Sequence, residues 1–224
     1  MIFITTAGKV GSAAARLIAQ RDVPVRVLIR HPEKAAALAQ AGVEIFRGDL
    51  DSPESIDQAV RGVPSVILVT SPVLHQELSV IDSAKRAGVE HVVKISTKNS
   101  ADSPIVRRRN HRKIEDALVA SGLSYTLLRN NAYMQNFLMM ASGIAKTSTF
   151  STATGDGRIG HVDVRDVGAV LPRSQSLRLA TPERRTGRPG LSRFRATTWL
   201  PSSPRFLADL SPFSRSPTRN RSKR

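Results

Sequence analysis

The sequence lacks cysteine entirely among its 224 residues. Disulfide bonds, cysteine-ligated metal sites and thiol nucleophiles are therefore excluded, and we expect no bound metal. No apolar run reaches the roughly 18 residues that span a bilayer. The first residues enter an apolar segment without the basic region and apolar core of a secretory signal. We therefore expect a cytoplasmic protein with no membrane segment, and 40% hydrophobic residues suffice for one domain with a sizeable core.

Acidic residues are scarce, because 18 Asp and Glu oppose 34 Lys and Arg and give a formal net charge of +16. Residues 173–224 hold 13 basic and 2 acidic residues, a net +11, which leaves +5 for residues 1–172. This last segment is rich in Arg, Ser and Pro and shows little periodicity. We expect residues 1–171 to form the folded domain and residues 172–224 to be a disordered basic tail.

Aromatic residues are also few, at 4% of the chain. A basic tail gives salt-dependent affinity for nucleic acid without sequence preference. It lacks the interleaved aromatic side chains on which bases stack. Nucleic-acid binding through the tail is therefore the weakest of the functional alternatives.

The first thirty residues carry the most informative pattern. An apolar run rich in β-forming residues covers residues 1–5, and glycines follow at Gly8 and Gly11. Apolar residues then recur at helical spacing, and a second apolar run covers residues 23–29. The order strand, glycine turn, helix and strand is typical of the start of a dinucleotide-binding unit.

The glycine turn suits a pyrophosphate for two physical reasons. A helix N-terminus carries unpaired N–H groups and a partial positive charge. A glycine has no Cβ, so a ligand can approach its backbone closely. The first of the usual three glycines is missing, so a plain turn with close helix packing is the alternative interpretation. The predicted cofactor contacts in this turn are Thr6, Gly8, Lys9, Val10 and Gly11.

Arg30 follows the second apolar run, about 20 residues past the glycines. NAD-binding units carry an acidic residue there, bonded to the 2′-hydroxyl of the adenosine ribose. A guanidinium instead pairs with a 2′-phosphate through parallel hydrogen bonds, and Lys34 adds a second charge one helical turn later. The sequence therefore predicts NADP(H) in preference to NAD(H). The alternative is a solvated loop arginine.

Strand and helix patterns alternate through the first 130 residues. Such alternation favours an α/β fold with a doubly wound parallel sheet of the Rossmann type. Ligands of such sheets bind past the carboxyl ends of the strands. The predicted strands are 1–5, 23–29, 43–47, 65–70, 91–96 and 124–129, and the predicted helices are 10–21, 32–40, 54–61, 75–87 and 108–121.

Six stretches together resemble the NmrA-like family of atypical short-chain dehydrogenases, particularly its bacterial NAD(P)H:quinone oxidoreductases. They are residues 8–11, 27–34, 47–51, 111–115, 121–130 and 162–166. The resemblance implies that Asp49 and Leu50 lie by the adenine, and that Thr70 and Ser71 lie along the ribose and phosphates. It also implies that residues 96–98 and 130–133 face the nicotinamide and substrate. From the residues alone, Asp49 is equally a loop or capping acid, and Thr70 and Ser71 can satisfy the backbone at a strand end.

A catalytic acid is harder to assign. The best-known short-chain dehydrogenases use a Tyr-x-x-x-Lys pair on a helix, and this chain has none. Tyr125 and Arg129 have that spacing, but on a predicted strand. His111 and Glu115 share one face of the predicted helix 108–121, so the carboxylate could orient or charge the imidazole. His111 is therefore the candidate proton donor, and the alternative is a surface histidine in a basic run.

The C-terminal residues depart from the family pattern. The resemblance implies a mixed α/β substrate-binding part after residues 162–166, whereas residues 172–224 do not resemble one. We interpret the chain as a frameshifted or truncated member with an aberrant substrate part. The expected function is an NADP(H)-dependent oxidoreductase for quinones or similar small carbonyl acceptors. The alternative is a non-catalytic NAD(P) sensor that binds a regulatory protein partner.

Overall fold

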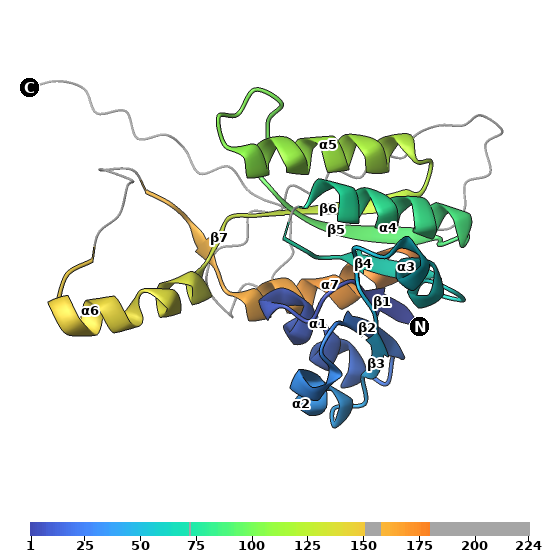
Figure 1. Cartoon of the computed structure of the whole chain (residues 1–224), viewed down its shortest axis with the longest axis horizontal. Helices are drawn as coiled ribbons and strands as arrows, with labels where there is room; N and C mark the ends of the chain where they lie inside the picture. Colours follow the sequence, from blue (N-terminus) through green and yellow to red (C-terminus); the bar gives the residue numbers. More distant parts are fainter. Residues whose placement is uncertain (72, 151–157, 180–224) are drawn as a thin grey trace, which may run out of the picture.

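The computed structural model describes residues 1–71, 73–150 and 158–179 (Figure 1). Their main feature is a parallel sheet in the order β3-β2-β1-β4-β5-β6. This order confirms the predicted doubly wound Rossmann-type sheet, because the chain moves outward from β1 in one direction and then in the other. The strands are β1 (Ile2–Ile4), β2 (Val25–Ile29), β3 (Glu44–Arg47), β4 (Ser65–Leu68), β5 (His91–Thr97) and β6 (Ser124–Asn130).

The crossover helices lie where the apolar periodicity predicted them. One difference is that the helix expected over 32–40 is divided into two short pieces. The backbone of Ala35 leaves the helical region, at φ −112° and ψ 9°, after a 3₁₀ turn that opens at Pro32. The helices are α1 (Lys9–Ala19), η1 (Pro32–Ala35), α2 (Ala36–Ala39), α3 (Pro53–Ala59), α4 (Leu74–Arg86) and α5 (Val106–Ala120).

The two faces of the sheet carry separate apolar cores, because successive side chains of a strand point to opposite faces. On one face α1 packs with Ile4, Val27 and Val93. The opposite face is covered by α3, α4 and α5 in Figure 1, and its core includes Phe3 and Val66. Both faces of the central strand β4 are therefore buried, as is typical of a strand in a parallel sheet covered by helices on both sides.

Helix α7 (Val164–Leu179) follows β8 in the chain and lies against α1 (Figure 1). A Cβ on Gly168 would lie 3.2 Å from the Cβ of Ala13, so the two backbones approach closely. The domain boundary predicted at residue 171 falls inside this helix. From residue 180 on, the predicted disordered tail lies outside the described residues.

The segment between β6 and α7 holds short elements that the sequence did not predict. They are β7 (Ala132–Tyr133), η2 (Met134–Met139), α6 (Ala141–Thr147) and β8 (His161–Val162). β7 and β8 pair in parallel as a small second sheet. Figure 1 shows α6 projecting away from the body of the domain. Across residues 1–71, 73–150 and 158–179, no helix has the length and hydropathy to cross a bilayer.

Candidate functional site

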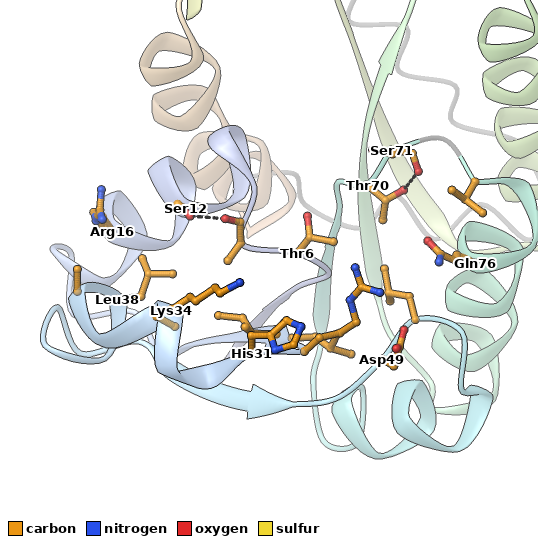
Figure 2. A pocket seen from close by; sticks show the side chains of 18 residues that line it. Thr6, Ser12, Arg16, His31, Lys34, Leu38, Asp49, Thr70, Ser71 and Gln76 are labelled. Carbon is orange, nitrogen blue, oxygen red and sulfur yellow. Dashed lines mark hydrogen bonds between the residues drawn. The ribbon is translucent and has the colours of Figure 1, made fainter. Parts of the chain in front are cut away.

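A cavity of about 530 Å³ opens at the carboxyl ends of β1, β2 and β4. This is the edge of the sheet at which ligands of doubly wound folds bind. Figure 2 shows Arg16, Lys34 and His31 on one side of the cavity, with Thr70 and Ser71 across from them. The cavity brings together most of the residues predicted to bind a cofactor, namely Thr6, Arg30, Lys34, Asp49, Leu50, Thr70 and Ser71.

The turn between β1 and α1 lies beside this cavity and is held from behind. The Oγ1 atom of Thr6 donates to the carbonyl of Val69 at 2.7 Å, which ties the turn to the end of β4. Gly8 is the N-cap residue of α1 and offers no side chain to the first N–H groups of the helix. The first helical turn also has no acidic residue. These N–H groups are therefore suited to bind an anion from outside the protein.

The two glycines of the turn have different surroundings. A Cβ on Gly11 would lie 1.9 Å from the carbonyl oxygen of Thr6, so packing alone requires glycine there. This agrees with the alternative interpretation of the motif at that position. A Cβ on Gly8 would have no closer neighbour than the Oγ1 atom of Thr6 at 3.8 Å. Gly8 therefore leaves open space that a ligand can occupy.

Lys9 and Val10 do not line the cavity with their side chains. Val10 is 5% exposed and belongs to the core under α1. The Nζ atom of Lys9 lies 3.4 Å from the carbonyl oxygen of Gln135 and 3.5 Å from the Oδ1 atom of Asn136. Lys9 thus links the glycine turn to η2. Only the backbone N–H groups of these two residues remain for the predicted role.

Basic side chains gather at the end of the cavity formed by α1, β2 and η1. Arg30 follows β2, Lys34 lies in η1, and Arg16 comes from α1. Among the described residues, neither Arg30 nor Lys34 forms an ion pair or hydrogen bond through its side chain. His31 also lines this end and lies 3.2 Å from Glu33. The charge of Arg30 acts on Asp51 without forming an ion pair, and cations that lack a paired carboxylate in a cavity favour an anionic ligand group.

Asp49 has the loop-capping role considered from the sequence, and it also lines the cavity. Its Oδ1 atom accepts a hydrogen bond from the backbone N–H of Asp51 at 3.0 Å, as a loop-capping acid does. Its own N–H donates to the Oγ atom of Ser55 at 3.0 Å. Asp49 nevertheless lines the cavity next to Leu50, whose side chain is mostly buried under α3. The acid is thus held in place by its own loop.

Thr70 joins the cavity to a buried ion pair that the sequence analysis missed. Its Oγ1 atom donates to the carbonyl of Ser71 at 2.6 Å and contacts the carboxylate of Glu77. The Nζ atom of Lys94 lies 2.7 Å from the Oε2 atom of Glu77, and both side chains are 0% exposed. One signal was present, because Lys94 is a charged residue within the otherwise apolar strand predicted over 91–96.

A second polar cluster lies where β5 and β6 end. Glu115 is 3% exposed and accepts hydrogen bonds from the Oγ atom of Ser96 and the Nδ2 atom of Asn99, each at 2.6 Å. Its carboxylate also pairs with Arg129, whose Nε atom lies 3.1 Å away. Glu115 is therefore occupied by these partners. No hydrogen bond joins Glu115 to His111 among the described residues, so the carboxylate does not orient the imidazole as predicted; its charge still acts on His111 and opposes the lowering of the imidazole pKa.

His111 is buried rather than on the surface, which also corrects the alternative that was considered for it. It is 5% exposed, and its Nδ1 atom has no hydrogen-bond partner among the described residues. Burial, followed by the charges of Lys94 and Arg107, lowers the pKa of His111 to about 4. The imidazole is therefore neutral at physiological pH. The Nδ2 atom of Asn130 is likewise buried without a partner.

The fold and the site define the class of the domain. It is a doubly wound Rossmann-type domain with an uncapped helix N-terminus at a cavity on the carboxyl edge of its sheet. Residues 1–172 match the NmrA-like family, and the chain belongs to this family. NAD(P)H azoreductase of Xenophilus azovorans is 34% identical over 167 residues, which are 73% of this chain and 58% of that protein. Quinone oxidoreductase 2 of Escherichia coli (strain K12) is 32% identical over 181 residues, which are 77% of this chain and 63% of that protein.

A solved structure also resembles this chain in both fold and sequence. An NADPH-dependent quinone oxidoreductase from Escherichia coli, complexed with NADPH, has a TM-score of 0.69 and 32% identity. The match covers 77% of this chain and 64% of that one. This chain therefore spans less than two thirds of the length of these three proteins.

Proposed function

We propose that the chain binds NADP(H) in the cavity and transfers hydride to a quinone or a similar small carbonyl acceptor. The observation that carries this proposal is the pairing of an uncapped helix N-terminus at Gly8 with unpaired cations at one end of the cavity. Further support comes from the relatives, which are named as NAD(P)H-dependent or quinone-reducing enzymes. Bound NADPH supplies the hydride, and the protein supplies binding and orientation.

The orientation of the coenzyme in the cavity follows from the positions of the basic residues and of the helix N-terminus. Its pyrophosphate fits the N–H groups of the glycine turn, and the 2′-phosphate of the adenosine fits Arg30 and Lys34. Asp49 and Leu50 are then beside the adenosine. The nicotinamide half extends toward the ends of β4, β5 and β6, where Thr70 and Ser71 begin the far wall.

Reduction of a quinone also requires protons. A quinone accepts hydride readily and can take its protons from water. His111 belongs to this proposal only as a hydrogen-bond donor from its neutral ring, because its lowered pKa leaves no imidazolium to supply a proton at neutral pH, and the proton then comes from water. A His111→Gln variant with unchanged turnover would remove His111 from the reaction and leave the reductase proposal standing.

The proposal is tested by steady-state oxidation of NADPH or NADH with a benzoquinone acceptor, using the full chain. Turnover with NADPH is expected to exceed turnover with NADH. Arg30→Asp is expected to raise the KM for NADPH about tenfold or more and to leave NADH nearly unaffected, because charged hydrogen bonds contribute roughly 1.5–3 kcal/mol. Arg21→Asp makes the same charge change outside the cavity and serves as the control.

Each outcome of this experiment has a definite meaning. Equal losses for both coenzymes in Arg30→Asp would refute the 2′-phosphate contact. Tight NADPH binding without turnover on any quinone would favour the alternative of an NAD(P)-sensing protein with a regulatory partner. Absence of binding would refute both functions.

A further inference from the structure

The hydroxyl of Thr70 is constrained in a way that determines what it can bind. A threonine hydroxyl has one hydrogen to donate and two lone pairs that accept. The two protein groups at its Oγ1 atom are the Ser71 carbonyl, at 2.6 Å, and the Glu77 carboxylate. Both groups accept hydrogen bonds when the carboxylate is ionised, so the single hydrogen is directed to the protein. Figure 2 shows Thr70 on the cavity wall with its bond to Ser71.

Burial raises the pKa of Glu77, and the positive charge of Lys94 opposes this shift and favours the ionised carboxylate. Lys94 reaches the carboxylate from β5, with its Nζ atom 2.9 Å from Oε1 and 2.7 Å from Oε2. The same Nζ atom donates to the carbonyl of Ile95 at 2.6 Å. Lys94 thus donates hydrogen bonds to Oε1 of Glu77 and to the Ile95 carbonyl, whereas Oε2 lies at ion-pair distance from Nζ but has no hydrogen-bond partner among the described residues. The pair is buried, and Thr70 connects it to the cavity.

Stability gives no sufficient reason for this arrangement. A fully buried ion pair is generally no more stabilising than apolar residues of similar size, because both charges lose their hydration. Glu77 and Lys94 are buried in α4 and β5 next to apolar residues such as Val80 and Val93. Their distinctive effect is to fix the orientation of one hydroxyl.

We propose that the Glu77–Lys94 pair holds Thr70 as a hydrogen-bond acceptor for a ribose hydroxyl on the nicotinamide side of the coenzyme. The inference rests on the proposed function. It adds that the Thr70 hydroxyl accepts, rather than donates, the hydrogen bond that it forms with the coenzyme. A phosphate oxygen only accepts, so Thr70 cannot bond to one in this state. This distinguishes Thr70 from the glycine turn and makes Glu77 and Lys94 positioning residues.

The orientation of the coenzyme determines which of its two riboses lies near Thr70. The cations lie at the β1–β2 end of the cavity, so the adenosine 2′-phosphate occupies that end. Thr70 follows β4, on the opposite side of β1 from β2. The ribose that reaches it is therefore the one beyond the pyrophosphate.

The test measures the affinity of the full chain for three ligands by calorimetry. NADPH contains both riboses, 2′-phospho-ADP-ribose keeps the second ribose but lacks nicotinamide, and 2′,5′-ADP lacks both the second ribose and nicotinamide. Thr70→Val is expected to weaken the first two ligands about fivefold to tenfold, the effect of one hydrogen bond, and to change 2′,5′-ADP less than about twofold. Thr70→Ser restores a hydroxyl and is expected to recover most of the loss.

The positioning role is tested with the double variant Glu77→Leu/Lys94→Met, which removes both buried charges together. It is expected to weaken 2′-phospho-ADP-ribose by about threefold or more relative to 2′,5′-ADP. A general loosening of the fold would weaken both ligands alike, so equal losses would overturn the positioning role. If this variant fails to fold, Thr70→Val still tests the acceptor role.

The remaining outcomes are also decisive. Unchanged binding of 2′-phospho-ADP-ribose by Thr70→Val, with a loss for NADPH alone, would assign the contact to the carboxamide and overturn the ribose assignment. A loss for 2′,5′-ADP as large as for the longer ligands would overturn it as well. If the unmodified chain binds none of the three ligands, the proposed function itself fails.

Discussion

At the level of single residues, Gly8 and Gly11 lie close together in the sequence but have different neighbours. Packing requires glycine at Gly11 and not at Gly8. Gly11 has the Thr6 carbonyl where a Cβ would lie, whereas Gly8 has open space. Neither glycine has a positive φ, so the turn requires glycine for space rather than for backbone conformation. The two glycines of the motif thus differ: packing requires glycine at Gly11, and Gly8 leaves the space at which we propose that a phosphate binds.

Alanine at each glycine should therefore have opposite consequences. Gly11→Ala is expected to lower the free energy of unfolding by about 2–3 kcal/mol, because the new methyl group clashes with backbone. Gly8→Ala is expected to change it by less than about 0.5 kcal/mol and to weaken NADPH binding instead. Urea unfolding and NADPH titration of both variants provide the test. NADPH affinity in Gly8→Ala equal to that of the unmodified chain would contradict a phosphate at this position.

His111 should make the stability of the fold depend on pH. Its pKa in the folded chain is lowered from 6.5 to about 4, so the unfolded chain binds a proton between these values and the folded chain does not. This contribution to stability is complete above about pH 6.5 and is lost as the pH falls toward about 4. Between about pH 7 and about pH 5 the loss is expected to be about 2 kcal/mol.

The measurement compares urea unfolding of the unmodified chain and of His111→Gln at the two pH values. The variant lacks the titrating group, so its free energy of unfolding should fall by about 2 kcal/mol less over this interval. His31→Gln removes an exposed imidazole and is the matched control. Equal pH dependence in the unmodified chain and His111→Gln would show that His111 is not buried as described.

At the scale of elements, the long periodic segments could be predicted from the sequence and the short ones could not. Helices such as α1 and α5 repeat an apolar face over several turns, which gives a clear signal. β7 and β8 contain two residues each and pair only through contacts made by the folded chain. Helix α7 was missed because the sequence beyond residue 171 becomes polar, and its position depends on packing against α1.

The contact between α7 and α1 should be sensitive to one glycine. Gly168→Val is expected to lower the free energy of unfolding by about 1–3 kcal/mol, because its side chain would displace α7 from Ala13 and Ala14. Gly143→Val in α6 places the same side chain where no atom lies within 4 Å, and it should cause no comparable loss. Thermal unfolding of the two variants measures the difference. Equal melting temperatures would contradict the close packing of α7 on α1.

At the scale of the whole molecule, β2 and β3 share the Arg26–Glu44 ion pair near their amino ends, but the two halves of the sheet differ in the charges near the cavity. The β3-β2-β1 half carries Arg30 and Lys34 with no ion-pair partner among the described residues. The β4-β5-β6 half carries compensated groups, namely Glu77 with Lys94 and Glu115 with Arg129. A dinucleotide with a phosphate on its adenosine ribose has the same asymmetry, with its extra charge at one end.

The site could be predicted from the sequence only where its residues follow strand ends. Arg30 was predicted from its place after the second strand, and the roles of Asp49 and Thr70 came from the family resemblance; all three line the cavity at the carboxyl edge of the sheet. The partners of Glu77 and Glu115 could not be found, because they join residues that only tertiary packing brings together. The burial of His111 depends on the same packing of α5 on the sheet.

The most direct measurement is calorimetric titration of the full chain with NADPH and, separately, with NADH. We expect saturable binding of NADPH at one site and binding of NADH weaker by about tenfold or more, since only NADPH carries the phosphate that Arg30 and Lys34 are placed to bind. No measurable binding of either coenzyme would contradict the assignment of the cavity.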